Sequence, residues 1–322
     1  MQPSLAAASL GRLDKVARRV CASGCLGRAG SHPPYGEFNE RTRAFSSEVV
    51  QPDAKGAAVS RSKVKDKIAI VTGAAGGLGF GIAARLAEEQ AVLLTDINAK
   101  LLGEAAAKLA ANGATVAHVA CDVSDRASVQ AAFAVAEDQL GEVTALANVA
   151  GVATYSPFGD LTEEMWDRTY AVNVKGTFLT CQEFVKRRNG RPGAIVNISS
   201  IGARMGLDTL VDYGSSKAAV IELSHSLARI GAPTRLRVNA VMPGLIWTDM
   251  WKGGAEWLIA NGVAPEGLTP EELFARTVEQ SVPMKRPQTL TDLGEMVAFL
   301  LSEKARNVTG QTIAVDGGVL MT

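Results

Sequence analysis

The sequence predicts an α/β fold built on a doubly wound parallel sheet with helices on both faces. Short apolar runs recur from Ile68 to the C-terminus, and they lack the polar alternation of half-exposed strands. Segments of helical period separate these runs one by one, and strict alternation of strand and helix predicts a parallel sheet. Glycine contributes 32 of the 322 residues, which suits a fold with many tight turns between strand and helix.

The alternation continues in regular order along the chain. The predicted strands are 68–72, 91–95, 115–121, 145–151, 194–199, 235–241 and 311–316. The predicted helices are 77–90, 98–113, 125–141, 162–189, 212–230 and 290–302. Sheets of this kind bind ligands at the carboxyl ends of their strands, and each motif described below falls at such an end.

The overall composition argues against several classes of function. The net charge is zero, whereas proteins that grip nucleic-acid phosphates usually carry a basic excess, so no nucleic acid is expected as a partner. No apolar run reaches the roughly eighteen residues of a spanning helix, so no membrane span is expected. The four cysteines are interpreted as buried free thiols. Cys21 and Cys25 lack a second ligand pair at metal-site spacing, and no metal is expected.

The first 47 residues differ in composition from the rest of the chain. Arginine and alanine are common, acids are few, and apolar residues recur at helical spacing, which is typical of an organelle transit peptide. The segment from Arg43 to Ser47 resembles a mitochondrial cleavage site, so the mitochondrial matrix is the favoured location. A plastid or cytoplasmic location stays open, as does a disordered extension or a wrongly assigned start. Residues 48–63 are interpreted as a linker and residues 64–322 as a single domain.

Three glycines mark the turn between the first strand and the first helix. Gly73, Gly77 and Gly79 stand where the backbone bends tightly or approaches a ligand. The N–H groups at the start of the following helix favour a pyrophosphate. The spacing T-G-x-x-x-G-x-G resembles that of the short-chain dehydrogenase/reductase family in its common form.

Further motifs carry the resemblance from about Ile68 to the C-terminus. Residues 148–151 end the fourth strand and stand for the family's N-N-A-G, with Val149 as a departure. Residues 243–248 are similar to the P-G-x-x-x-T run that holds the nicotinamide carboxamide in this family. The resemblance implies a Rossmann-like domain that binds a nicotinamide cofactor. The implied contacts are Gly73, Gly77, Leu78, Gly79, Asp96, Asp122, Val123, Asn148, Ala150, Gly151, Tyr213, Lys217, Pro243, Gly244, Ile246 and Thr248.

Asp96 favours NAD over NADP. It follows the second strand, where NAD users of the family place an acid for the adenosine ribose. Neither the glycine turn nor the two residues after Asp96, Ile97 and Asn98, supply a cation for a 2′-phosphate. NAD is therefore the expected cofactor, and NADP is the less favoured alternative.

Tyr213 and Lys217 lie four residues apart, which places them on one face of a helix. In the family this Y-x-x-x-K pair is catalytic, with a serine thirteen positions before the tyrosine, here Ser200. Hydride transfer at a carbinol carbon requires a proton to move at its oxygen, and tyrosine has an ordinary pKa near 10. We therefore expect Lys217, together with the oxidised nicotinamide, to lower the pKa of Tyr213. Ser200 would hydrogen-bond the substrate oxygen.

The resemblance implies two further roles in this site. Lys217 would also hold the nicotinamide ribose. Asn173 occupies the position of the family's fourth catalytic residue, where it would bend its helix and hold a water that relays protons. Asparagine is a poor helix former, which is compatible with a bend at this point.

The segment from about 247 to 283 corresponds to the mobile substrate lid of the family. It carries several aromatic residues, and Met205, Leu207 and Leu210 lie on the loop after Ser200. An apolar pocket for a secondary alcohol or ketone is expected, although the aromatics could equally form a packing core of the lid itself. In this family the helices predicted at 162–189 and 212–230 pack between subunits, so a homo-tetramer or dimer is expected.

The expected function is NAD-dependent interconversion of a secondary alcohol and a ketone, with Tyr213 as acid/base. One alternative is an organellar 3-oxoacyl-carrier reductase that uses NADPH, and Asp96 argues against it. Another alternative is a non-catalytic nucleotide-binding scaffold. The complete catalytic set, Asn173, Ser200, Tyr213 and Lys217, argues against that function.

Overall fold

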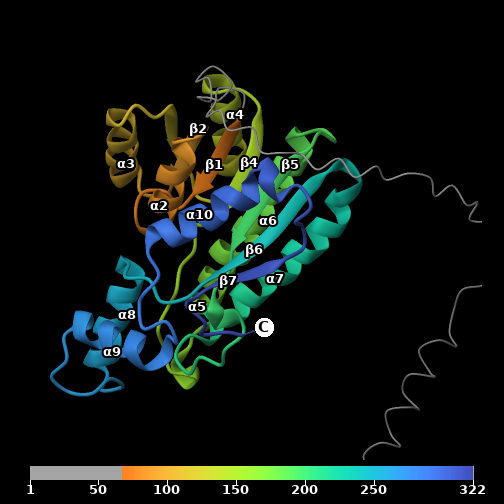
Figure 1. Ribbon diagram of the computed structural model, residues 1–322. Helices are drawn as coiled ribbons and strands as arrows, with labels where there is room; N and C mark the ends of the chain where they lie inside the picture. The colour runs from red at the N-terminus through yellow and green to blue at the C-terminus, as the bar shows by residue number, and fades with distance from the viewer. Residues whose placement is uncertain (1–66, 322) are drawn as a thin grey trace, which may run out of the picture. The chain divides into compact units, whose positions relative to one another are not determined.

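The computed structural model describes residues 67–321. The predicted transit peptide at 1–47 and linker at 48–63 lie outside the described residues, so both stay predictions. From Ile68 onward, strands and helices alternate in the predicted order (Figure 1). Within residues 67–321, no helix combines the length and the apolar character that crossing a membrane requires.

Seven strands form a parallel sheet in the order β3-β2-β1-β4-β5-β6-β7. They are β1 (Ile68–Thr72), β2 (Ala91–Asp96), β3 (Val116–Ala120), β4 (Val143–Asn148), β5 (Gly193–Ile198), β6 (Leu236–Pro243) and β7 (Thr312–Val315). The strand order proceeds outward in both directions from β1 and β4, which confirms the doubly wound fold. The crevice between these two strands is the switch point at which such sheets bind ligands.

Alternate residues of the strands face two separate cores. Ala69 and Val71 of β1 pack with α2, α3 and α10 on one face of the sheet. Ile68 and Ile70 pack with α4, α6 and α7 on the other face. Figure 1 shows α10 lying across the sheet beside α2. The helices are α2 (Gly77–Ala87), α3 (Ala99–Ala111), α4 (Arg126–Gln139), α5 (Glu163–Tyr170), α6 (Thr177–Arg187), α7 (Val211–Gly231), α8 (Asp249–Ala260), α9 (Pro270–Ser281) and α10 (Leu290–Leu301).

The long helix predicted at 162–189 has an irregular centre. The chain runs from α5 through a π-helical turn, η3 (Ala171–Gly176), into α6 without a break. At the junction, the hydroxyl of Thr177 donates to the Asn173 carbonyl at 2.7 Å. The prediction of one regular helix is therefore wrong in its middle, while the predicted distortion around Asn173 is found as a π turn. Turns of this kind occur frequently at functional sites.

Strand β4 ends at Asn148, three residues before the predicted end at Gly151. The cause is Thr72, the last residue of the neighbouring β1. Its hydroxyl oxygen accepts hydrogen bonds from the N–H groups of Val149 at 3.0 Å and Ala150 at 3.1 Å. These bonds turn the chain away from the sheet and open the crevice between β1 and β4.

Candidate active site

A cavity of about 850 Å³ lies at the carboxyl ends of the strands. Its walls come from the glycine turn, from the loops after β2 to β6, and from the beginnings of α7 and α8. Every site residue predicted from the sequence lines this cavity except Asn148 and Asn173. Residues separated by up to 175 positions in the chain, from Gly73 to Thr248, thus meet in one site.

The glycine turn is sterically restricted to glycine. Gly73 has a φ of +66°, and an added Cβ would lie 2.8 Å from the Cα of Ala150. An added Cβ on Gly79 would overlap the carbonyl oxygen of Gly73. The absence of side chains brings backbone N–H groups to the cavity floor at the start of α2. This cradle fits the pyrophosphate of a dinucleotide, which such helix starts bind through N–H groups and the helix dipole.

Asp96 is held at the edge of the cavity by two backbone groups. Its carboxylate accepts hydrogen bonds from Ala75 N–H at 3.1 Å and from Asn98 N–H at 2.9 Å. The first bond ties the end of β2 to the glycine turn. The carboxylate is therefore oriented beside the phosphate cradle, where a ribose would provide hydroxyl donors. This arrangement fits the adenosine half of NAD.

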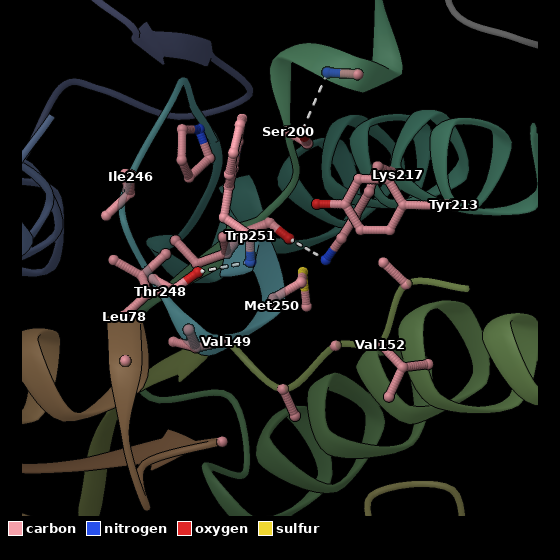
Figure 2. Close-up of a pocket in the computed structure, with 18 of the residues that line it drawn as sticks. Leu78, Val149, Val152, Ser200, Tyr213, Lys217, Ile246, Thr248, Met250 and Trp251 are labelled. Carbon is pink, nitrogen blue, oxygen red and sulfur yellow. Dashed lines mark hydrogen bonds between the residues drawn. The ribbon is translucent and has the colours of Figure 1, made fainter. Parts of the chain in front are cut away.

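The loop after β6 forms the opposite side of the cofactor cradle. Gly244 donates its N–H to the carbonyl of Val315 at 3.1 Å, and an added Cβ would lie 2.8 Å from the Cα of Asp316. Thr248 begins α8, and its hydroxyl accepts the N–H of Trp251 at 3.4 Å. An added Cβ on Gly77 would lie 3.8 Å from Thr248 Cγ2, so this loop adjoins the glycine turn, and Figure 2 shows Thr248 close to Leu78.

Tyr213, Lys217 and Ser200 meet at the other end of the cavity. Tyr213 and Lys217 lie one turn apart on α7, and Figure 2 shows them side by side with Met250 opposite. Lys217 Nζ donates to the carbonyl of Ile198 at 3.0 Å. The Ser200 hydroxyl accepts the N–H of Gly202 at 3.0 Å. An added Cβ on Gly202 would lie 3.4 Å from this hydroxyl oxygen and 3.7 Å from the Tyr213 ring, so both groups lie beside Gly202. The predicted catalytic group is thus assembled from the end of β5 and the first turns of α7.

Burial changes the pKa values of the two ionisable residues. Burial lowers the pKa of the Lys217 ammonium, which is 4% exposed, to about 8. Burial also raises the pKa of Tyr213, and the hydrogen bond from Ser200 opposes this shift only in part. Desolvation of the phenolate is the largest cause of this rise, and Lys217 Nζ is directed to the Ile198 carbonyl. The expected lowering of the Tyr213 pKa by Lys217 together with the oxidised nicotinamide stays a prediction.

Comparisons with known proteins agree with this geometry. Residues 73–320 match a family model described as enoyl-(acyl carrier protein) reductase. The chain is 35% identical over 260 residues to 2-(S)-hydroxypropyl-CoM dehydrogenase 3 of Xanthobacter autotrophicus, covering 80% of this chain and 98% of the relative. It is 32% identical over 263 residues to galactitol 2-dehydrogenase of Agrobacterium fabrum, and the match covers 81% of this chain and 100% of the relative. It is 34% identical to short-chain dehydrogenase/reductase eriH of Hericium erinaceus, covering 79% and 97%.

The chain belongs to the short-chain dehydrogenase/reductase family. Solved structures of similar proteins share its fold. A ketoreductase of actinorhodin polyketide synthesis, crystallised with NADPH, superposes with a TM-score of 0.74 at 30% identity, covering 79% of this chain and 97% of that chain. An NAD⁺-bound xylitol dehydrogenase superposes with a TM-score of 0.72 at 30% identity, covering 78% and 98%. Membership of the family therefore implies a nicotinamide cofactor. It does not distinguish NAD from NADP, so that choice has to be argued from the residues of this site.

Asn148 and Asn173, two predicted members of this family site, lie behind the cavity wall. The Asn148 side chain is turned into the core, where it donates to Asn197 Oδ1 at 2.8 Å and accepts from the Thr180 hydroxyl at 2.7 Å. It supports the end of β4 and does not reach the cavity. Asn173 binds both backbone groups of Val152, accepting its N–H at 2.8 Å and donating to its carbonyl at 2.9 Å.

Through these two hydrogen bonds, the Asn173 side chain holds the loop after β4 in position. An added Cβ on Gly151 would lie 3.1 Å from Lys217 Nζ and 3.3 Å from Asn173 Oδ1, so the two polar groups approach each other beside this glycine. The predicted water relay stays a prediction.

The predicted lid contains α8 and α9, and its aromatic residues divide between two roles. Trp247, Trp251 and Phe274 pack together, with ring centroids 4.7–6.2 Å apart. Trp251 also lines the cavity, together with Met250. Phe274 is buried below them among apolar residues of the lid. The segment from 247 to 283 thus has its own packing core, and its residues Met250 and Trp251 form an apolar part of the cavity wall.

The structure adds lining residues that the sequence patterns did not indicate. Tyr155 lies on the loop between β4 and α5, and Arg168 lies on α5. No family motif contains either residue, and neither belongs to a recognisable spacing. Their side chains reach the cavity because the loop after β4 and the last turn of α5 lie over the crevice. Arg168 places a second basic residue, besides Lys217, at the wall of this cavity.

Proposed function

We propose that this protein is an NAD-dependent oxidoreductase that interconverts a secondary alcohol and a ketone. One observation carries the proposal: Ser200, Tyr213 and Lys217 meet at one end of a cavity whose other end carries the glycine cradle and the Asp96 carboxylate. A bound nicotinamide supplies the acceptor or donor for a hydride. The residues of the chain then have to bind the substrate oxygen and move its proton.

Tyr213 moves the proton at the substrate oxygen. In the oxidative direction the tyrosinate accepts the hydroxyl proton while the carbinol carbon loses its hydride, and the products are a ketone and the neutral phenol. In the reductive direction the phenol donates the proton to the developing alkoxide. The Ser200 hydroxyl, which lies beside Tyr213 at Gly202, provides a second hydrogen bond to the same oxygen. Lys217 places a cationic group within reach of both the tyrosine and the cofactor site.

Asp96 is the basis for the choice of NAD. A carboxylate fixed by Ala75 and Asn98 can accept the two hydroxyls of an adenosine ribose. A 2′-phosphate in that place would meet a like charge, which is costly at a recognition site. One of the similar solved structures contains NADPH and another contains NAD⁺, so the choice of NAD rests on the residues of this chain.

The substrate class follows from the cavity walls and agrees with the relatives. Apolar residues from the loop after Ser200 and from α8 enclose the space beside Tyr213; they include Met205, Leu207, Leu210, Met250 and Trp251. The relatives include D-threitol dehydrogenase of Mycolicibacterium smegmatis and galactitol 2-dehydrogenase, both named for alcohols. We infer that the substrate is a small or medium secondary alcohol or its ketone.

A screen of nicotinamide fluorescence tests the proposal against its two alternatives. Purified protein is offered NAD with secondary alcohols, NADH with ketones, and NADPH with a 3-oxoacyl thioester. Turnover of alcohols or ketones with NAD(H) is the expected result. Preferred use of the thioester with NADPH would favour the carrier reductase. Cofactor binding without any turnover would favour the scaffold.

We infer two further properties, an organelle address and an oligomeric state. The composition of residues 1–47 supports a mitochondrial transit peptide, which N-terminal sequencing of protein isolated from its organelle would test. The surface of α5 and α6 supports a homo-tetramer or dimer, because Trp166 and Phe178 are 36% and 40% exposed there. Light scattering at micromolar concentration tests this, and a monomer would contradict it.

A further inference from the structure

Tyr155 has no part in the mechanism described above, although its side chain lines the substrate end of the cavity. Tyr155 and the catalytic Tyr213 line the same cavity, and the loop that carries Tyr155 is bonded to the chain just before α7 through Ser156 and Thr209. Burial is the largest cause of the rise in the Tyr155 pKa to about 12, and no hydrogen bond within the described residues contributes. Tyr155 is therefore a neutral phenol at physiological pH, and its hydroxyl is available to a ligand.

The position of Tyr155 is fixed from two sides. On one side, its neighbour Ser156 donates its backbone N–H to the carbonyl of Thr209 at 3.0 Å, which ties this loop to the loop after Ser200. On the other side, the Tyr155 ring packs against Trp257 of α8 with centroids 6.0 Å apart. The hydroxyl rests on the backbone of α8 at Gly254, because an added Cβ there would overlap the hydroxyl oxygen.

The walls around this hydroxyl are mostly apolar. Leu207, Leu210 and Met250 line the same part of the cavity. A hydroxyl in such surroundings is costly to desolvate unless the bound molecule supplies a hydrogen-bond partner. Tyr213 and Ser200 are already assigned to the oxygen of the reacting carbon. Tyr155 is therefore suited to a different oxygen of the same substrate, close to the first.

We propose that Tyr155 is a specificity-determining residue whose hydroxyl binds a second oxygen on the carbon next to the reacting carbon. Vicinal diols and hydroxy ketones are then preferred to simple alcohols and ketones of the same carbon skeleton. This inference rests on the proposed alcohol/ketone activity and names its substrate class. A group that hydrogen-bonds a substrate hydroxyl discriminates against the analogue that lacks it, because the protein group is left without a partner.

The test compares matched substrates in the wild type and in Tyr155→Phe. In the first pair, butan-2-ol is compared with butane-2,3-diol. In the second pair, cyclohexanol is compared with cyclohexane-1,2-diol. We expect the ratio of kcat/KM for diol over simple alcohol to fall about tenfold in Tyr155→Phe, the effect of one lost hydrogen bond. Tyr170→Phe is the matched control, because Tyr170 stacks on Trp166 at 4.7 Å and does not line this cavity. The control should keep the wild-type ratio.

A second pair of variants tests the same point without changing Tyr155. Gly254→Ala displaces the hydroxyl and should lower the diol preference, whereas Gly253→Ala meets nothing within 4 Å and should not. An unchanged ratio in both Tyr155→Phe and Gly254→Ala overturns the inference while the proposed activity stands. Absence of turnover for every alcohol in the wild type overturns the proposed activity and the inference with it.

Discussion

The Nζ of Lys217 lies 5.8 Å from the centre of the Tyr213 ring. The ammonium lies over the tyrosine ring and donates a hydrogen bond to the Ile198 carbonyl at 3.0 Å. Its influence on the phenolate is that of a nearby charge acting through a buried medium, where Coulomb interactions are stronger than in water. The two residues adjoin in one buried site, and each can be tested separately by substitution.

Tyr213→Phe should abolish turnover and leave the fold and cofactor binding largely intact. The substitution removes one hydroxyl, and proton transfer by a positioned group contributes roughly a hundredfold to ten-thousandfold in rate. The measurement is kcat in the alcohol screen, together with NAD binding followed by fluorescence. Retention of more than about half of the wild-type rate would contradict the role of Tyr213 as the acid/base.

Lys217→Met should change how stability depends on pH. Burial holds the pKa of Lys217 at about 8, below its value of 10.5 in the unfolded chain. Between these two values the unfolded state binds more protons, so the wild type gains stability as the pH rises. The full gain is on the order of 3 kcal/mol, at about 1.4 kcal/mol for each pKa unit. Lys217→Met lacks this gain.

Urea unfolding at several pH values from 7.5 to 10 measures the difference between the two proteins. The upper limit is set by Tyr213, whose raised pKa gives a contribution of the opposite sign above pH 10. Subtracting the variant from the wild type removes the contributions of all other groups. Parallel stability profiles would show that Lys217 titrates normally in the folded state.

Gly79→Ala should weaken cofactor binding and lower stability. In an ordinary helix this substitution is favourable by roughly 1 kcal/mol, but here the new Cβ would overlap the Gly73 carbonyl. The turn has to move, and with it the N–H groups of the cradle. Gly76→Ala is the control, because nothing lies within 4 Å of its added Cβ. We expect NAD affinity and Tm to fall for Gly79→Ala alone; equal effects would refute the steric argument.

The sequence was sufficient to predict the features that depend on local chemistry. The seven strands follow from apolar runs, because a parallel strand buried on both faces has no polar alternation. Gly73 and Gly79 were predictable because a backbone turn without side chains leaves a fixed spacing in the sequence. Tyr213 and Lys217 were predictable because one helical turn sets their separation.

Features that depend on tertiary packing were not predictable. The side chain of Asn148 turns into the core because Asn197 and Thr180, distant in sequence, offer it partners there. The rise in the pKa of Tyr213 reflects burial under loops and a lid whose positions no pattern reveals. Tyr155 and Arg168 reach the cavity only because the loop after β4 folds over it. Such residues require the structure before a role can be proposed.

We propose that the charge at the Asp96 end of the cavity decides between NAD and NADP. Asp96 is oriented toward the glycine turn by Ala75 and Asn98, and the next residue, Ile97, is 73% exposed and apolar. Arg168 is a cation of the cavity wall, but it comes from α5 and not from the end of β2. Arg168→Ala should therefore leave the ratio of NAD to NADP use unchanged. A marked fall in NADP use would identify Arg168 as a 2′-phosphate ligand.

NAD should be preferred over NADP by roughly a hundredfold or more in kcat/KM, since like charges at a recognition site cost several kcal/mol and each 1.4 kcal/mol is about tenfold. Replacing Asp96 by Ala and Ile97 by Arg should narrow or reverse this ratio, because the variant removes the repelling carboxylate and adds a guanidinium that binds phosphate. Asp96→Ala alone separates the two effects, and steady-state kinetics with both cofactors measures them. Equal use of NAD and NADP by the wild type would mean that the Asp96 carboxylate does not meet the ribose.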